Sequence, residues 1–255
     1  MIDGFREFEF DLPEALLVSL INAFDGMLSA PMLEKNVKLL PEAQGVYQLC
    51  YGDEIVYIGK TDGEAGLRQR LSRHYWTIQH RCNLEPSEVW FKAIRVFVFT
   101  AIDLETQLIS HYEHKERKTK VSWNKSGFGS NDPGRERDTT RLKIGGFDAN
   151  FPVDLDRPLR LGVEGALSAA KVLEALRKVV PYTVRAQRKP NSARMAHPDL
   201  DNELRVVSNP TTARAVIESV VAALPSGWQA TLLPGRVILY KERKTYSAGS
   251  LIAAS

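Results

Sequence analysis

Apolar and polar positions in the first half of the chain alternate first with the period of a strand and then with that of a helix. Two short runs rich in β-branched and aromatic residues are joined by Gly52-Asp53, which is typical of a tight turn. Strands are expected at residues 46–51, 54–60 and 89–100, and helices at 64–81 and 100–116. This order predicts an α+β domain, a three-stranded antiparallel sheet flanked by helices.

The remaining pattern divides the chain into three regions. Asp11, an early proline and Glu14 precede an apolar run, which predicts an N-terminal helix. Residues 122–158 are rich in the turn formers Gly, Asn, Asp and Pro. Beyond them, helices are expected at 166–179 and 212–223, strands at 182–188 and 204–207, and a hairpin pairing 229–233 with 237–240. We expect an N-terminal helical arm (1–40), a domain with a basic loop (41–158) and a C-terminal α+β region (159–255).

Composition changes this picture little. Charged residues make up 25% of the chain and hydrophobic ones 44%, as in an ordinary globular protein. No run approaches the roughly 20 apolar residues of a membrane span, and the first residues lack the pattern of a signal peptide. Two cysteines are too few for a disulfide framework. A cytoplasmic protein with no membrane partner is expected.

The distribution of charge is more informative than the net charge of +3. Residues 111–143 hold nine Lys and Arg against five acidic residues. The nucleic-acid-binding candidates among them are Lys125, Arg135, Arg137 and Arg141. Such a segment can face phosphates, and composition alone fits a solvated charged loop equally well.

The helix expected at 64–81 carries two polar residues beside its apolar face. At about 100° per residue, the core-facing stripe comprises Leu67, Leu71, Tyr75 and Ile78. Arg70 and His74 are then neighbours, one turn apart, at one border of this stripe. Taken alone, these two residues are best explained by an arginine that extends its charged end into solvent and a histidine whose hydrogen bonds are satisfied at the edge of the core.

Glu105 is unusual because it falls inside the apolar stripe of the next helix, among Leu104, Leu108, Ile109 and Tyr112. A carboxylate there is costly unless it is paired or binds a metal. The alternative is stabilisation of the helix N-terminus by its charge. Asn124 follows Trp123 at the entrance of a loop, and taken alone it is typical of a turn residue.

Taken together, these residues resemble a known set. The order Gly45-Val-Tyr47, Tyr57-Ile-Gly59, Arg70-x-x-x-His74, Glu105 and Asn124 resembles the GIY-YIG nuclease superfamily. The resemblance covers residues 45–124, about a third of the chain. It implies a metal-dependent nuclease that hydrolyses phosphodiester bonds.

The resemblance also implies roles for the matching residues. Tyr47 would orient or deprotonate the attacking water, and Tyr57 would line the same pocket. Arg70 would hold the scissile phosphate, while His74 would form a hydrogen bond near the tyrosine or the leaving group.

The remaining roles concern charge and metal. Glu105 would bind a single Mg²⁺, for which Mn²⁺ substitutes, and Asn124 would steady the metal site. Lys60 would add positive charge beside the phosphate. One carboxylate can suffice because Mg²⁺ keeps several waters. A tyrosine becomes a usable base only where cations stabilise its phenolate.

A narrower resemblance involves residues 127–138, GFGSNDPGRERD. Together with the chain length, this segment is similar to GIY-YIG type II restriction endonucleases that cut CCGCGG. Such a palindrome implies a homodimer on double-stranded DNA and a companion DNA methyltransferase encoded nearby. Arg135, Arg137 and Arg141 suit guanine edges and phosphates equally.

Two other functions fit the same residues. One is a repair, mobile-element or phage-defence nuclease with different target selection, and the other is a DNA-binding module without cleavage. Residues 159–255 have no counterpart in the resemblance. They could enlarge a dimer interface, bind another protein, form a structural appendage, or read flanking DNA. The basic residues that would read DNA are Arg185, Arg188, Lys189 and Arg194.

Overall fold

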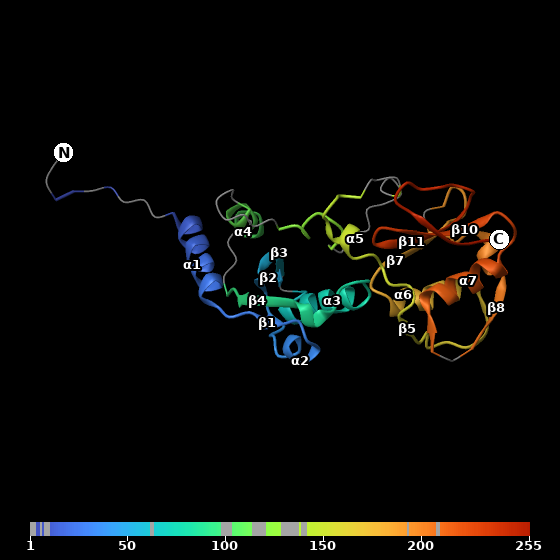
Figure 1. Cartoon of the computed structure of the whole chain (residues 1–255), viewed down its shortest axis with the longest axis horizontal. Coiled ribbons are helices and arrows are strands. Elements are labelled where there is room, and N and C mark those ends of the chain that lie inside the picture. The colour runs from blue at the N-terminus through green and yellow to red at the C-terminus, as the bar shows by residue number, and fades with distance from the viewer. Residues whose placement is uncertain are drawn as a thin grey trace. The chain divides into compact units, whose positions relative to one another are not determined.

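The chain forms a mixed α+β structure in which helices pack on antiparallel and mixed sheets (Figure 1). The computed structural model describes residues 4, 5, 7, 11–61, 64–97, 104–113, 121–128, 138, 142–192, 194–207 and 210–255. Contacts group the chain into two compact units, Met1–Ser72 with Pro86–Val121, and Arg73–Glu85 with Ser122–Ser255. These units do not follow the boundary expected near residue 158, and the three-region division stays a prediction.

The sheet of the first unit has four strands rather than the expected three. Its order is β1-β4-β2-β3, and every pair is antiparallel. The strands are β1 (Ala30–Pro31), β2 (Gly45–Tyr51), β3 (Glu54–Thr61) and β4 (Val89–Arg95). The added strand β1 escaped the sequence analysis because two residues carry no alternation, and its proline has no N–H for a further strand. Strand β4 ends at Arg95, short of the expected residue 100.

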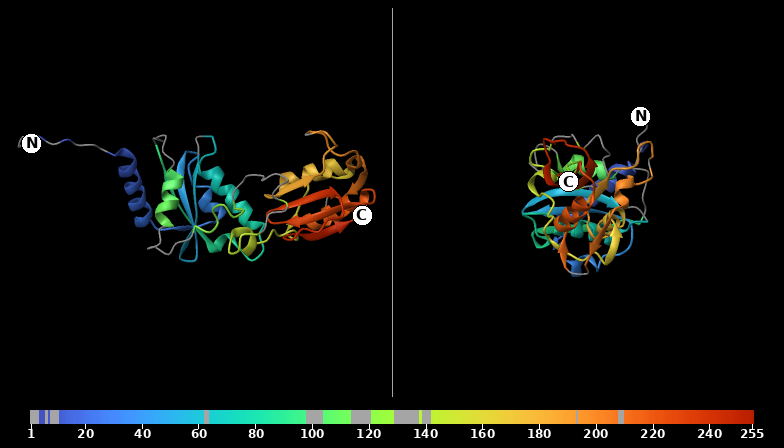
Figure 2. Two further views of the ribbon diagram at one scale, coloured as in Figure 1. Left: turned by 90° about the horizontal axis from the view of Figure 1, so that it is seen from above. Right: turned by 90° about the vertical axis from the view of Figure 1, so that its right-hand side faces the viewer.

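Helices lie on both faces of this sheet (Figure 2). They are α1 (Leu12–Gly26), α2 (Glu34–Val37), α3 (Leu67–Gln79) and α4 (Leu104–Tyr112). As the sequence predicts, the Asp11 carboxylate caps α1 by accepting a hydrogen bond from the Glu14 N–H at 2.9 Å. Apolar residues of α1 and α4 pack with Val46 and Ile58 on one sheet face. The first turns of α3 approach the other face.

Both glycines of the strand pair are required by close packing. A Cβ on Gly59 would meet the hydroxyl of Tyr47, whose ring crosses from β2 over β3, and would lie 2.5 Å from Cζ of that ring. A Cβ on Gly45 would meet the Ile94 carbonyl oxygen and lie 2.8 Å from Leu67 Cδ1. The sheet can therefore admit the Tyr47 ring and helix α3 only where side chains are missing.

The second unit is built on a mixed sheet with the order β12-β10-β11-β7. Its elements are α5 (Phe147–Asn150), β5 (Pro158–Leu159), β6 (Gly165–Ser168), α6 (Ala169–Val179), β7 (Thr183–Ala186), β8 (Glu203–Val206), β9 (Thr211–Thr212), α7 (Ala213–Ala223), β10 (Trp228–Leu233), β11 (Arg236–Lys241) and β12 (Ser250–Ala254). Strands β11 and β7 are parallel. The predicted helices and the β10–β11 hairpin are present, although α6 begins at Ala169 rather than at residue 166, because β6 occupies the preceding residues. The elements α5, β5, β6, β9 and β12 were not expected.

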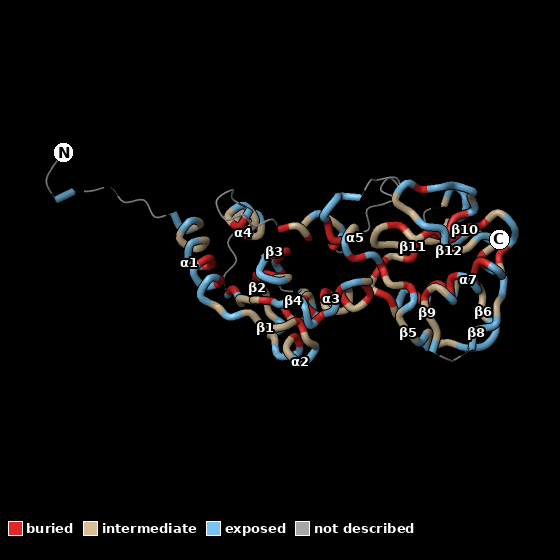
Figure 3. Tube along the Cα trace, in the orientation of Figure 1, coloured by how far each residue is buried: buried red, intermediate tan, exposed pale blue. Residues whose placement is uncertain are grey.

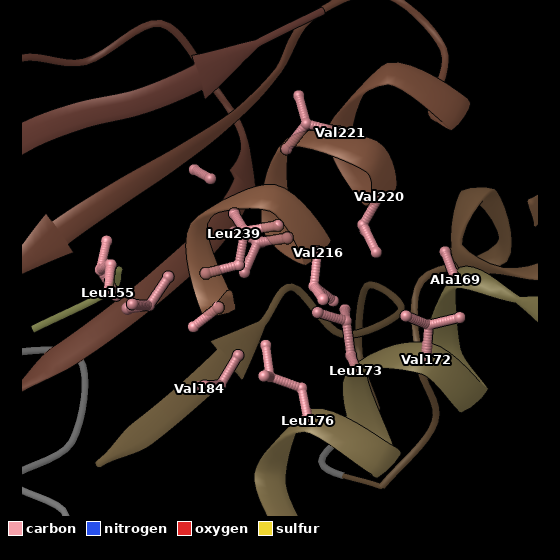
Figure 4. Close-up of a cluster of buried hydrophobic side chains, with 14 of the residues drawn as sticks. Leu155, Ala169, Val172, Leu173, Leu176, Val184, Val216, Val220, Val221 and Leu239 are labelled. Atoms are coloured by element: carbon pink, nitrogen blue, oxygen red, sulfur yellow. The ribbon is translucent and has the colours of Figure 1, made fainter. Parts of the chain in front are cut away.

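The core of the second unit lies between this sheet and helices α6 and α7 (Figure 4). Leu173 and Leu176 from α6, Ile217 from α7 and Leu239 from β11 are fully buried there. The alternation of buried and exposed positions along both helices can be followed in Figure 3. This periodicity is why the sequence pattern located both helices within a few residues.

A buried ion pair stabilises the irregular part of the second unit. Arg81 donates to the Asp148 carboxylate at 2.7 Å and to the Phe151 carbonyl at 3.0 Å, and its side chain is only 4% exposed. The carboxylate lies against Gly127 and Gly235, both with positive φ, and a Cβ on either would crowd it. One charge pair thus joins the end of α3, the loop at 127, α5 and the β10–β11 turn.

We predict that Gly59→Ala lowers the free energy of unfolding by about 1 to 3 kcal/mol, because the added methyl meets a ring with no room to move. Gly26→Ala is the control, since a Cβ there has no neighbour within 4 Å. Urea denaturation followed by circular dichroism measures both. Equal stability of the two variants would contradict the close packing.

Asp148→Ala should lower the free energy of unfolding by about 3 to 5 kcal/mol, because it leaves the Arg81 charge buried without its partner. Glu174→Ala removes the exposed pair with Lys178, whose side chains are 63% and 71% exposed, and should lower the free energy of unfolding much less, because solvent screens an exposed pair. The same denaturation experiment compares the two. A smaller loss for Asp148→Ala than for Glu174→Ala would contradict this account.

Candidate active site

Two tyrosines from adjacent strands form the centre of the candidate site. The β2–β3 register pairs Tyr47 with Gly59 and Leu49 with Tyr57, so both tyrosines project from the same sheet face. Their ring centroids lie 6.0 Å apart with an interplanar angle of 31°. Tyr47 is fully buried and Tyr57 is nearly so, and their hydroxyls hydrogen-bond to each other.

Arg70 on α3 completes a polar group with these tyrosines. Its guanidinium donates a hydrogen bond to the Tyr47 hydroxyl, and its positive charge acts on both phenols. Its Nε is buried, and no group in the described part of the chain accepts a hydrogen bond from this atom. A buried cationic donor without an acceptor is suited to an anionic ligand such as a phosphate oxygen.

Glu105 contributes the negative charge of the site. It is half-buried in the first turn of α4, while Leu104, Leu108 and Tyr112 are buried, as the helical pattern predicts. Its charge acts on both Tyr57 and Arg70. Four expected residues from four elements therefore interact: Tyr47, Tyr57, Arg70 and Glu105.

Burial dominates the protonation of the tyrosines. It raises the pKa of Tyr47 well above its ordinary value, and the neighbouring Tyr57 raises this pKa further, whereas Arg70 lowers it. Burial also raises the pKa of Tyr57, followed by the charge of Glu105. Both phenols are therefore neutral near pH 7. A tyrosine base would require further positive charge at the site.

His74 and Asn124 belong to the second unit. His74 is 5% exposed rather than at the border of the helix, and its ring stacks on Phe128 with centroids 4.5 Å apart. Phe128 in turn packs against Trp123 and Phe147. Asn124 is half-buried in the turn that follows Trp123. The sequence does not predict that Phe128 stacks on His74. These two residues are 54 positions apart, and a local pattern relates only residues that are near in sequence.

The remaining predicted residues are all cations, Lys60, Lys125, Arg135, Arg137 and Arg141. Lys60 is exposed and pairs with Val46, so strand alternation directs it to the sheet face opposite Tyr57 and Gly59. This geometry does not favour the role beside the phosphate. Lys125 is exposed, with a φ of 55°. Arg135, Arg137 and Arg141 lie outside the described residues.

The donor set is compatible with magnesium but not with a closed metal site. Within the described ranges, no three His, Cys, Asp or Glu side chains gather as they would around zinc. Glu105 offers a carboxylate next to Arg70, where a substrate phosphate would bring further oxygens. Mg²⁺ is commonly held by one or two carboxylates together with substrate phosphates and water.

Comparisons with known proteins give no assignment. The chain matches no model of a protein family, and no curated protein matches it either. Among the described helices, none has the length and apolar character needed to cross a membrane.

The electrostatic coupling can be tested without substrate. Replacing Glu105 by Gln should lower the pKa of Tyr57, because a carboxylate opposes formation of a second negative charge and an amide does not. Titration of ¹³C-labelled tyrosine by NMR, following the ring carbon that bears the hydroxyl, measures the change. Glu113→Gln is the control, because Glu113 is exposed and lies just beyond the end of α4. An unchanged or higher pKa of Tyr57 in Glu105→Gln would disprove the coupling.

Proposed function

We propose that this protein is a magnesium-dependent endonuclease of the GIY-YIG type that hydrolyses phosphodiester bonds in double-stranded DNA. The observation that carries the proposal is the convergence of Tyr47, Tyr57, Arg70 and Glu105. These residues come from two strands and two helices, and they are the same residues on which the resemblance in sequence rests. The packing that requires glycine at both Gly45 and Gly59 adds support, because it accounts for the glycine of each motif.

Phosphodiester hydrolysis needs an oriented water, charge neutralisation on the phosphoryl oxygens and stabilisation of the leaving 3′ oxygen. Arg70 meets the second need, because its buried Nε donates to a non-bridging oxygen of the scissile phosphate. The Tyr47 hydroxyl, fixed by Arg70 and Tyr57, accepts a hydrogen bond from the attacking water and orients it. As the new P–O bond forms and the P–O3′ bond breaks, the water loses a proton and the 3′ oxygen gains one.

Glu105 would hold the metal. When bound, Mg²⁺ supplies positive charge to the phosphoryl and leaving oxygens and favours the phenolate form of the tyrosines. Mn²⁺, which also prefers oxygen ligands, should substitute. His74 and Asn124 remain candidates on the family resemblance alone, for contacts to the leaving group and support of the metal site.

The finer proposal is a type II restriction enzyme with CCGCGG as its site. It rests on the similarity of residues 127–138 to enzymes of that specificity. A palindrome presents two equivalent half-sites, so the active form would be a homodimer with one site per strand. A DNA methyltransferase gene adjacent to this one would favour restriction over a repair, mobile-element or phage-defence nuclease.

We predict that the purified protein cuts plasmid DNA into discrete fragments in Mg²⁺. Glu105→Ala and Tyr47→Phe should each reduce the rate at least about 100-fold, because the first removes the metal ligand and the second the hydroxyl that orients the water. The matched controls are Glu113→Ala, just beyond the end of α4, and Tyr51→Phe on β2, which should cut as the wild type does. Sequencing the cut ends identifies the site and the stagger of the two cuts.

Each other outcome selects a different function. Random degradation that depends on Glu105 would retain the nuclease and exclude the restriction enzyme. Binding of DNA in Ca²⁺ without cleavage in Mg²⁺ or Mn²⁺ would indicate a DNA-binding module. Discrete fragments that persist in Glu105→Ala would place the chemistry elsewhere and overturn the proposed site.

A further inference from the structure

The second unit contains a cleft whose charged lining residues are all positive among those that the structure describes. It has a volume of about 990 Å³ and lies between α6, β7 and the segment that follows β7. Five lining residues are Lys or Arg, and within the described part of the chain no Asp or Glu lines it. They are Arg177, Arg185, Arg188, Lys189 and Arg194. None of these is part of the candidate active site.

The basic segment after β7 is a defined hairpin rather than a loose loop. Arg188 forms a β-bridge with Ala196, and the Lys189 N–H donates to the Met195 carbonyl at 3.0 Å. At the tip, the Ser192 hydroxyl accepts a hydrogen bond from the Met195 N–H at 3.0 Å. At the base, the Gln187 N–H donates to the Leu239 carbonyl at 2.8 Å. The hairpin therefore presents its cations from a backbone anchored to the sheet.

The cations in the cleft have different surroundings. Arg185 lies 3.7 Å from the buried Asp138 carboxylate, which Arg236 also approaches at 3.6 Å, and the Arg185 side chain is 17% exposed, so it already faces a carboxylate of the protein. Arg188, Lys189 and Arg194 are exposed, and none of them pairs with a carboxylate among the described residues. The structure thus separates Arg185 from three cations that sequence alone had grouped with it.

Arg177 and Arg188 lie close enough at the wall of the cleft for their charges to act on each other. The Arg177 side chain is held there by a hydrogen bond from its Nε to the Val184 carbonyl at 2.7 Å. Burial lowers the pKa of Arg177, the nearby Glu174 opposes this shift, and the charge of Arg188 lowers the pKa further. Such crowding of like charges opposes folding, and a bound polyanion would relieve it.

We propose that this cleft binds the phosphate backbone of double-stranded DNA through Arg177, Arg188, Lys189 and Arg194. Its volume exceeds what one phosphate would fill, and its cations are spread over a helix and a hairpin, which suits a chain of phosphates. Flexible exposed Lys and Arg side chains provide sequence-independent contacts that position a protein on a duplex. The choice of DNA rests on the proposed function, whereas the polyanion-binding character rests on the cleft alone.

The experiment measures binding of a short labelled DNA duplex by fluorescence anisotropy, with Ca²⁺ in place of Mg²⁺, over a series of salt concentrations. The first variant, called the groove variant, removes three cations of the cleft by combining Arg188→Ala, Lys189→Ala and Arg194→Ala. The control variant combines Arg160→Ala, Lys171→Ala and Arg205→Ala, which remove the same charges from exposed positions that do not line the cleft. A labelled RNA duplex of the same sequence is measured in parallel.

We expect the groove variant to bind DNA at least about 10-fold more weakly at low salt. Its plot of log K against log salt concentration should be shallower by about 2.7, since each phosphate contact contributes about 0.9. The control variant should match the wild type. Equal loss of affinity in the two variants, or tighter binding of the RNA duplex, would overturn the inference.

The results distinguish failure of the cleft proposal from failure of the proposed nuclease function. If plasmid is not cut but the groove variant alone loses DNA affinity, the cleft is supported and the nuclease proposal fails. If plasmid is cut and both variants bind DNA like the wild type, the nuclease stands and the cleft does not bind DNA. Circular dichroism tests whether both variants are folded. We expect them to fold because all six substituted positions are exposed.

Discussion

The first unit depends on the contact between the Tyr47 ring and the backbone of Gly59. Tyr47 is on the central strand β2, and its ring needs the space that a Cβ on β3 would occupy. A slip of the β2–β3 register by one residue would place Ile58 or Lys60 under the ring, and both have side chains. This contact therefore selects a single pairing of the strands, and that pairing brings the phenols to Arg70.

The same close packing sets the chemistry of the site. Removing Tyr47 and Tyr57 from water keeps both phenols neutral, while Arg70 and Glu105 supply opposite charges beside them. A neutral pair of hydroxyls can fix a water molecule but cannot readily remove its proton. In the proposed nuclease, substrate and metal would therefore complete the electrostatics of the site, so that reactivity would develop only with both present.

Local patterns in the sequence were sufficient for part of the structure. Residue periodicity located the β2–β3 hairpin, α6 and α7, and alternation could also have shown that Lys60 faces away from Tyr57. The short edge strand β1 and the stacking of His74 on Phe128 depend on residues distant in sequence, which periodicity does not relate. Arg81 and Asp148 are likewise 67 positions apart. The motif residues Tyr47, Tyr57, Arg70 and Glu105 were found because their order, rather than any local period, was distinctive.

The position of Asp148 limits how the sequence can vary. Its carboxylate fills the space where Gly127 and Gly235 lack side chains, and it neutralises Arg81. A Cβ at Gly127 would clash with the carboxylate, and one at Gly235 would lie 3.1 Å from it, so a larger residue at either glycine would crowd the partner of the arginine. We therefore expect related chains that keep the arginine and the aspartate to keep both glycines as well, since the positive φ at each position already disfavours a side chain.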